Sequence, residues 1–274
     1  MTTETIYLKE ENKAITLKTY ISGDEPEIMA KPRPAVIVIP GGAYFFWSDR
    51  EGEPIVKRFF AAGFNCFLLH YSIRPHAKFP TPLQDISRAV IHIKENAEKY
   101  NVDPEKVFVC GFSAGGHLAA SLGTMWHFDM AKPWPDMPYG QNKPAGMILC
   151  YPVITLEPPH AHEVCANEVT GNNVNEETIA LYSCEKQVSD KTVPAYIWTT
   201  FDDDCVDSEN SLMMASAMKA AGIPFELHIF SQGHHGLATA DDETSRGWPG
   251  WSLPDVATWL DEAIAWAKNL DKGQ

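Results

Sequence analysis

The sequence predicts one α/β domain built on a mainly parallel sheet with helices on both faces. From residue 35 onward, short apolar runs typical of buried strands alternate with segments whose apolar residues recur at helical spacing. The chain has 274 residues, 45% of them hydrophobic and 21% charged, which suits one large domain or at most two small ones. One apolar run also leads directly through a Gly-x-Ser-x-Gly turn into a helix. We therefore treat residues 1–274 as a single domain.

The N-terminal region favours an antiparallel hairpin followed by the first central strand. Apolar residues alternate or cluster at residues 6–8 and 14–21, and the polar segment 9–13 separates them. Residues 31–34 contain two prolines and are expected to form a loop. The continuous apolar run at 35–39 then predicts a buried central strand.

The remainder of the chain continues this alternation. Further strands are predicted at 64–71, 107–110, 145–151, 195–199 and 224–230. Helices are predicted at 51–62, 83–100, 117–122, 208–221 and 253–270. Loops or turns are predicted at 72–82, 101–105 and 128–143. Residues 155–192, after the sixth strand, are long, polar and weakly periodic, and we interpret them as an insertion and a possible cap or lid.

Ser113 lies in the turn Gly111-Phe-Ser-Ala-Gly115, between the apolar strand and an Ala- and Leu-rich helix. This is the context of a nucleophile elbow, in which small neighbours allow a sharp turn that lifts the hydroxyl above the sheet. The N-terminus of the following helix favours the negative charge that develops there. Gly-rich strand-to-helix turns also occur in α/β proteins without this chemistry, but the strand and helix on either side favour a nucleophilic Ser113.

A serine nucleophile requires a base, and the base requires an anionic partner that fixes its tautomer. In the chain order Ser, acid, His, the acid follows a late strand and the histidine follows the last one. Segment 200–207 and the motif Gly233-His-His-Gly236 occupy these two places. Because the loops after parallel strands meet at one edge of the sheet, both can reach Ser113. The residues alone leave open which acid and which histidine act; the candidates are Asp202, Asp203, Asp204, Asp207, His234 and His235.

These motifs resemble those of α/β-hydrolase-fold esterases of the hormone-sensitive-lipase-like group, and in particular small bacterial acetyl xylan esterases and carbohydrate esterases. The resemblance extends from about residue 35 to residue 260. It is carried by five groups of residues: Pro40-Gly-Gly-Ala-Tyr44 with Arg50-Glu-Gly-Glu-Pro54; Tyr71-Ser-Ile-Arg-Pro75 with Phe79, Pro80 and Asp85; Gly111-Phe-Ser-Ala-Gly-Gly-His117; Asn210-Ser-Leu212; and Gly233-His-His-Gly236. The chain departs from the family pattern in two places. Pro40 and Ala43 replace the first and last residues of the usual His-Gly-Gly-Gly motif, and Asp207 stands where proline is common. Neither change removes a backbone N–H that catalysis needs.

The resemblance implies that Ser113 is the nucleophile and that His235, which precedes Gly236, is the general base and then the general acid. His234 is then a neighbour with a structural or substrate role. The backbone N–H groups of Gly42, Ala43 and Ala114 are expected to form the oxyanion hole. One such donor typically contributes about 3 kcal/mol of transition-state stabilisation.

The same resemblance identifies Asp203 as the acid of the triad. In this loop the family has an Asp, two variable residues and a Val, and alignment on Val206 and residues 210–212 places that Asp at 203. Asp202 is the second choice. Asp207 is expected to be the N-cap of the next helix, and Asp204 is expected to face solvent or cap local N–H groups.

Composition excludes several classes of partner. The net charge is −14 and the isoelectric point about 5.1, which argues against nucleic acid and anionic membranes as ligands. No signal peptide is visible at the N-terminus and no apolar run is long enough to span a membrane. The six cysteines form no C-x-x-C pair, which favours a reduced, cytoplasmic setting. We expect a small-molecule or oligosaccharide ester as the ligand, and a homo-oligomer is possible.

No cofactor and no metal are expected. His160 and His162 have the spacing of metal ligands but lie in a polar insertion without a matching Cys or His cluster, so a solvated loop is the preferred interpretation. The aspartates of 202–207 lack the glycine and the terminal glutamate of an EF-hand.

Three aromatic residues are candidate substrate contacts. Trp248 and Trp251 follow His235 closely and are either core residues or a platform for a sugar ring. Tyr44 and the aromatic residues after it, at 45–47, are expected to shorten the acyl pocket.

The leading hypothesis is therefore a serine carboxylesterase that removes short acyl groups, acetyl first among them, from a carbohydrate such as acetylated xylo-oligosaccharides. It would act through a Ser-His-Asp triad and an acyl-enzyme. A serine peptidase of the same fold is an alternative, but it requires an additional binding domain or an anionic anchor for a peptide amine, and no domain of that length is visible. A non-catalytic hydrolase-fold binding protein is a third, but such proteins usually lack a member of the triad.

Overall fold

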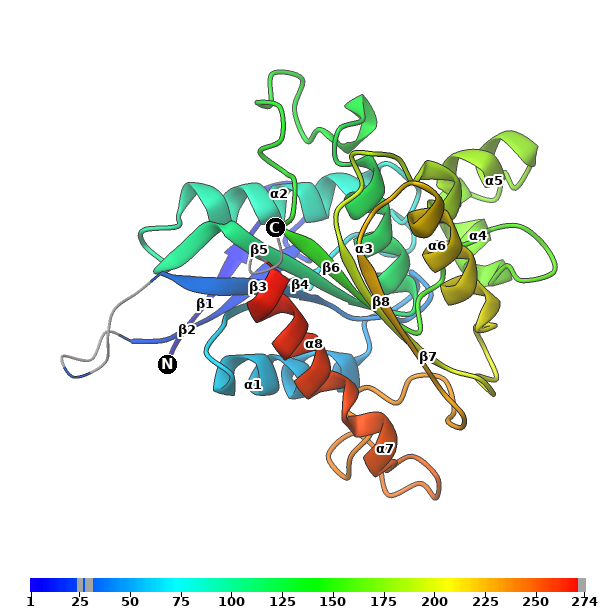
Figure 1. The fold of residues 1–274 in the computed structure, drawn as a ribbon. Coiled ribbons are helices and arrows are strands. Elements are labelled where there is room, and N and C mark those ends of the chain that lie inside the picture. The colour runs from blue at the N-terminus through cyan, green and yellow to red at the C-terminus, as the bar shows by residue number, and fades with distance from the viewer. Residues whose placement is uncertain (24–26, 28–31, 271–274) are drawn as a thin grey trace.

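An eight-stranded sheet forms the centre of the computed structural model, which describes residues 1–23, 27 and 32–270. Within those residues the strands are ordered β1-β2-β4-β3-β5-β6-β7-β8 (Figure 1). The six strands from β3 to β8 are mutually parallel, whereas β1 and β2 pair antiparallel at one edge. The strands are β1 (Thr2–Tyr7), β2 (Thr16–Ile21), β3 (Arg33–Ile39), β4 (Asn65–His70), β5 (Val102–Phe112), β6 (Gly146–Cys150), β7 (Ala195–Thr200) and β8 (Phe225–Phe230).

Helices cover both faces of this sheet (Figure 1). On one face α2 (Thr81–Glu95), α3 (Ala114–Met125) and α6 (Glu209–Ala220) pack against the sheet and share one apolar cluster with it. On the other face α1 (Glu53–Ala61) and α8 (Trp259–Asn269) share a second cluster with the sheet. The predicted α/β-hydrolase class, a mainly parallel sheet between two helical layers, is confirmed.

Shorter helices lie in the segments between these strands and helices. They are η1 (Asp49–Glu51), η2 (Asp129–Ala131), α4 (Glu163–Thr170), α5 (Glu176–Tyr182), η3 (Cys184–Gln187) and α7 (Pro254–Ala257). None of the helices in the described part of the chain is long and apolar enough to cross a bilayer.

Two segments predicted as loops or turns are wrong because they belong to strands. Of the loop predicted at 31–34, residue 31 lies outside the described residues, and Arg33 and Pro34 are the first residues of β3. Residues 102–105 of the turn predicted at 101–105 form the start of β5, where Val102 pairs with Arg33. The register of this pair shifts between Arg33 and Ala35, which lets the strand accommodate Pro34.

Three predicted helices have different bounds. The helix predicted at 51–62 is interrupted at Gly52, where η1 ends and α1 starts. The helix predicted at 83–100 is α2, which begins at Thr81 and ends at Glu95. The helix predicted at 253–270 is divided at Thr258 into α7 and α8.

The predicted insertion at 155–192 contains α4, α5 and η3 and lies beside α3 and α6 (Figure 1). It is joined to the rest of the domain by buried contacts. The N–H of Cys184 donates to the carbonyl of Ile154 at 2.9 Å, and the carbonyl of Tyr182 accepts from His117 of α3 at 2.9 Å. Its role as a cap stays a prediction.

The parallel strands bring four predicted segments to one edge. The loops after β3, β5, β7 and β8 leave the carboxyl ends of these strands and carry Gly41, Ser113, Asp203 and His235. In open α/β sheets this is the edge at which ligands bind.

Candidate active site

Ser113 occupies a strained turn between β5 and α3. Its φ is 52° and its ψ −117°, a backbone conformation that L-residues rarely adopt. The two flanking glycines allow close backbone approach: a Cβ on Gly111 would lie 2.1 Å from the carbonyl oxygen of Gly115, and one on Gly115 would lie 2.2 Å from that of Ile39. The Gly-x-Ser-x-Gly pattern is thus explained by sterics, as expected for an elbow.

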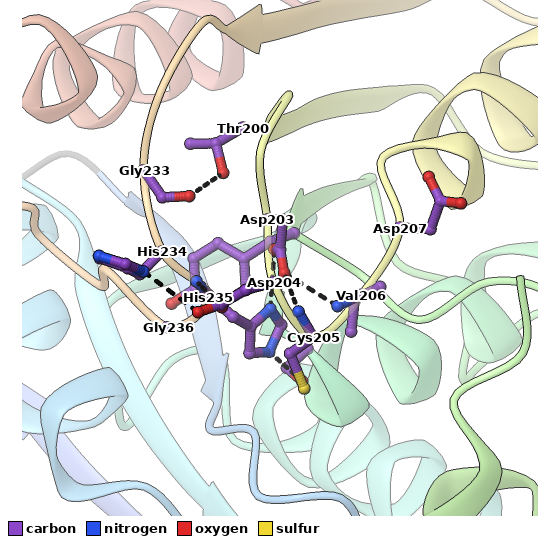
Figure 2. Close-up of polar contacts among 12 residues, drawn as sticks. Thr200, Asp203, Asp204, Cys205, Val206, Asp207, Gly233, His234, His235 and Gly236 are labelled. Atoms are coloured by element: carbon purple, nitrogen blue, oxygen red, sulfur yellow. Dashed lines mark hydrogen bonds and ion pairs between the residues drawn. The ribbon is translucent and has the colours of Figure 1, made fainter.

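The side chains of Ser113, His235 and Asp203 form a continuous hydrogen-bonded chain. Ser113 Oγ lies 2.8 Å from His235 Nε2, and His235 Nδ1 lies 2.8 Å from Asp203 Oδ2. Figure 2 shows the imidazole of His235 beside the Asp203 carboxylate. The Asp203 side chain is fully buried and that of His235 is 16% exposed, so both groups are largely shielded from water.

The Asp203 carboxylate is held in a fixed orientation by its own loop. Its Oδ1 accepts hydrogen bonds from the backbone N–H groups of Cys205 and Val206, both at 2.9 Å (Figure 2). Oδ2 is therefore the atom that faces the imidazole.

The two flanking aspartates bind the backbone of the histidine loop (residues 231–240). Asp202 Oδ1 accepts from the N–H of Gly233 at 2.6 Å. Asp204 Oδ1 accepts from the N–H of His235 at 3.1 Å, and its Oδ2 lies 3.1 Å from His234 Nδ1 (Figure 2). The His235 N–H and the His234 side chain lower the pKa of Asp204 against the effect of burial. These two acids thus orient the loop, and neither contacts the imidazole of His235.

Asp207, the fourth acid, lies at the start of α6. Its Oδ1 accepts from the N–H of Glu209, the first residue of α6, at 3.0 Å, but the N-cap position of this helix is Ser208 and not Asp207 as predicted. Its Oδ2 lies 2.6 Å from His160 Nδ1, and these two contacts lower the pKa of Asp207.

The candidate oxyanion loop, residues 40–47, makes a tight turn after β3. Gly42 has a φ of 122° and Ala43 a φ of 54°. The N–H groups of Phe45 and Phe46 both donate to the carbonyl of Gly42, at 2.8 and 3.1 Å. Within the described residues, the N–H groups of Gly42 and Ala43 have no hydrogen-bond partner. Ala114, the third predicted donor, is the first residue of α3, where backbone N–H groups precede the intrahelical ladder.

Tyr44 does not line the site, so its predicted contact with substrate is wrong. Its side chain is fully buried, and its hydroxyl lies 2.8 Å from His117 Nδ1. His117 Nε2 donates to the carbonyl of Tyr182, and burial lowers the pKa of His117 to about 4. His117 is therefore neutral, with Nδ1 free to accept from Tyr44. The ring packs edge-on against Tyr71 and Phe79, and this tertiary environment was invisible in the sequence.

Trp248 and Trp251 lie next to the histidine loop. Trp251 stacks on His234 with ring centroids 5.7 Å apart and has the guanidinium of Arg50 4.8 Å from its ring centre. Trp248 packs edge-on against Trp251 and is 46% exposed. An exposed aromatic surface is thus present near His235, and its contact with substrate stays a prediction.

The sequence analysis assigned no role to Arg50, Glu51 and Tyr151, which support the site. The buried carboxylate of Glu51 accepts hydrogen bonds from Gly41 and Tyr151. Arg50 Nη1 donates to the carbonyl of Gly236 at 2.7 Å. Arg50 and Glu51 belong to one of the motifs that carry the resemblance, and that motif was the only available signal.

The His-x-His spacing serves local structure. His160 pairs with Asp207, and His162 Nδ1 accepts from the N–H of Cys165 in the first turn of α4 at 3.2 Å. Across the described ranges 1–23, 27 and 32–270, no three His, Cys, Asp or Glu residues are arranged to hold a metal ion.

Comparison with known proteins identifies the family. The model of the BD-FAE family matches residues 24–218, which include the candidate oxyanion loop, Ser113 and Asp203. The chain belongs to the BD-FAE family. His235 lies beyond the matched segment, and its place is supported by the geometry described above.

The relatives of this BD-FAE family member include esterases and a xylanase. Endo-1,4-beta-xylanase B of Butyrivibrio fibrisolvens is 41% identical over 222 residues, covering 80% of this chain and 34% of the relative. Acetylxylan esterase of Xylanibacter ruminicola is 29% identical over 231 residues, covering 82% of this chain and 45% of the relative. The chain thus spans less than half the length of these two curated relatives.

A solved structure matches over nearly the whole chain. The acetyl ester-xyloside bifunctional hydrolase from Caldicellulosiruptor lactoaceticus is 33% identical, with a TM-score of 0.82, and the match covers 98% of this chain and 96% of that one. The predicted resemblance to α/β-hydrolase esterases of the hormone-sensitive-lipase-like group and to acetyl xylan esterases is confirmed.

Proposed function

We propose that this member of the BD-FAE family is a serine carboxylesterase that removes acetyl and other short acyl groups from carbohydrates such as acetylated xylo-oligosaccharides. The observation that carries the proposal is the hydrogen-bonded chain Ser113–His235–Asp203 at the carboxyl edge of the sheet. A serine hydroxyl, an imidazole and a buried carboxylate in this order constitute the machinery of acyl transfer.

In the first half of the reaction, Ser113 Oγ attacks the ester carbonyl carbon while His235 Nε2 takes its proton. Asp203 Oδ2 accepts the Nδ1–H of His235, which fixes the productive tautomer and stabilises the imidazolium that forms. The N–H groups of Gly42, Ala43 and Ala114 receive the negative charge on the carbonyl oxygen. The bond to the sugar oxygen then breaks, and His235 gives its proton to that oxygen.

In the second half, water attacks the acyl-enzyme. His235 takes a proton from the water as its oxygen bonds to the acyl carbon, and then returns the proton to Ser113 Oγ as the acid leaves. Every proton in this cycle passes between Ser113, His235, the sugar oxygen and water, so the proposed reaction uses no cofactor.

The carbohydrate preference rests on similarity and on the exposed tryptophans. The named activities of two similar proteins are acetylxylan esterase and acetyl ester-xyloside hydrolase. Trp248 is half exposed and packs on Trp251, which stacks on His234, and aromatic faces suit the apolar faces of sugar rings. We propose that residues 155–192, which lie beside α3 and α6, form a cap over the site.

The direct test compares p-nitrophenyl esters of increasing chain length with acetylated xylo-oligosaccharides, using Ser113→Ala as the control. The proposal expects hydrolysis of both the acetyl ester and the acetylated saccharides by the wild type alone. Absence of any ester hydrolysis in the folded wild type would refute it.

The acyl pocket is expected to be short. The N–H groups of Phe45 and Phe46 both donate to the Gly42 carbonyl. This turn keeps their bulky, half-exposed side chains close in the chain to the proposed oxyanion N–H groups of Gly42 and Ala43. We expect kcat/KM for p-nitrophenyl acetate to exceed that for the octanoate by about 10²-fold, because a long chain must displace these rings. Phe46→Ala should narrow this ratio, and a wild type that prefers octanoate contradicts the prediction.

The tryptophans are expected to contribute to binding of the sugar. Trp248→Ala and Trp251→Ala should each lower kcat/KM for acetylated xylo-oligosaccharides about tenfold while changing that for p-nitrophenyl acetate less than about threefold, because only the saccharide stacks on the rings. Trp134→Ala is a matched control, since Trp134 contacts Arg88 of α2 instead. Equal losses on both substrates would indicate a folding defect and contradict a role in sugar binding.

A further inference from the structure

Glu51 is a buried acid beside the site that the mechanism above does not use. It is the last residue of η1, and only 3% of its surface is exposed. Burial of a carboxylate is costly unless each oxygen is satisfied by hydrogen bonds. Both oxygens of Glu51 have a partner, and the two partners belong to different parts of the site.

The first partner is the candidate oxyanion loop. The N–H of Gly41 donates to Glu51 Oε2 at 2.8 Å, immediately before the proposed oxyanion donors. Gly41 also packs tightly on the elbow: a Cβ at Gly41 would lie 2.9 Å from Ser113 Cβ and 2.8 Å from the carbonyl oxygen of Phe112. Glu51 thus holds the oxyanion loop at Gly41, the residue that packs against Cβ of Ser113.

The second partner reaches the histidine loop through Tyr151. The Tyr151 hydroxyl donates to Glu51 Oε1 at 2.8 Å and accepts from the N–H of Ala238 at 3.0 Å. The Tyr151 ring packs edge-on against the imidazole of His235, with centroids 5.0 Å apart. Tyr151 has a φ of 37°, a strained conformation for a non-glycine residue that persists only when the surroundings impose it.

We infer that Glu51 is a positioning residue of the proposed esterase, whose two carboxylate oxygens fix the oxyanion loop and, through Tyr151, the histidine loop relative to Ser113. The inference rests on the proposed function. A carboxylate accepts hydrogen bonds at both oxygens, whereas the amide of glutamine accepts at one and donates at the other. Glutamine at this position therefore keeps the shape of the side chain but loses one of the two connections.

Glu51→Gln is expected to lower kcat for p-nitrophenyl acetate by about 10- to 100-fold and to change KM less than about threefold, because small misplacement of reacting groups costs rate more than ground-state binding. A trifluoromethyl ketone, which adds to a serine as a tetrahedral oxyanion, should lose affinity by a similar factor. A purely structural defect would instead lower the amount of folded enzyme. The folded fraction would then keep the wild-type kcat, KM and affinity for the ketone.

The chain provides a matched control in Glu53, two residues further on. Glu53 also accepts a tyrosine hydroxyl, that of Tyr20 at 2.7 Å, but its side chain is half exposed and the hydrogen bonds it accepts come from Tyr20 and Lys18 of β2. Glu53→Gln should leave kcat, KM and inhibitor affinity unchanged.

Tyr151→Phe keeps the test decisive if Glu51→Gln folds poorly. It removes the hydroxyl bridge, retains the ring and should lower kcat about tenfold at constant KM. In the double variant Glu51→Gln, Tyr151→Phe, the amide oxygen at position 51 can accept from the N–H of Gly41, and its NH₂ no longer faces a tyrosine hydroxyl. The loss of kcat should therefore be smaller than the product of the two single losses. Wild-type kcat in both folded single variants would overturn the inference while leaving the esterase intact. A wild type that hydrolyses no ester would instead refute the proposed function.

Discussion

Replacing Ser113 by alanine is expected to lower kcat for p-nitrophenyl acetate by about 10⁶-fold, the scale of loss when the nucleophile of a serine triad is removed. The physical reason is that Ser113 Oγ, which lies 2.8 Å from His235 Nε2, is the proposed atom on which the acyl-enzyme forms. The small residual rate should come from water activated near His235 and from the oxyanion N–H groups. Steady-state kinetics at matched protein concentration measure the effect.

A fluorophosphonate provides the direct control for this assignment. It should label the wild type at Ser113, block hydrolysis in proportion, and leave Ser113→Ala unlabelled. Ser121→Ala is the matched variant, because Ser121 is likewise a buried serine, but it lies within α3 and contacts Cys184. Full activity in Ser113→Ala, or labelling at another residue, contradicts the nucleophile assignment.

The fold was predictable because burial leaves a strong signal in its central elements. The strands around Ile37, Val109 and Ile148 are buried on both faces, so they appear as continuous apolar runs. The helix α2 buries one stripe, and its apolar residues recur at helical spacing. These patterns depend on local sequence and on sheet layering alone.

The errors occur where tertiary pairing outweighs local preference. Pro34 normally disfavours an interior strand, but the shifted register between β3 and β5 accommodates it. Residues 103–105 are Asp, Pro and Glu, yet the pairing of Val102 with Arg33 extends β5 through them. Gly52 divides a segment whose apolar spacing suggests one helix, and its ψ of −108° is incompatible with continuation.

At the site, chemistry was more predictable than packing. Ser113 and the position of the histidine pair 234–235 follow from chain order and from the glycines beside them, whereas the choice of His235 over His234 follows from the family resemblance. The error at Tyr44 arose because its burial depends on His117, Tyr71 and Phe79, and all three lie far from Tyr44 in the sequence. The role inferred for Glu51 has the same character, since its partners Gly41 and Tyr151 meet only in the folded chain.

Asp203→Asn is expected to lower kcat by about 10⁴-fold, far more than the same change at Asp202 or Asp204. The Asp203 loop explains the size of the effect. Because Oδ1 accepts from the N–H groups of Cys205 and Val206, the amide introduced at position 203 would keep its oxygen there and present its NH₂ to His235 Nδ1. Nδ1 must then accept, the proton moves to Nε2, and the imidazole can no longer take the proton of Ser113.

The neighbouring aspartates provide controls that change the same charge at the same loop. Asp202→Asn retains an oxygen for the N–H of Gly233, and Asp204→Asn retains one for the N–H of His235, so both should preserve the histidine loop and lose less than about tenfold in kcat. Asp207→Asn keeps its contact with Glu209 and should be similarly mild. The measurement compares kcat of all four variants after their melting temperatures show that each is folded. A loss below tenfold at Asp203, with a far larger loss at a neighbour, would assign the acid to that neighbour, because only the residue that orients His235 can impose the unproductive tautomer.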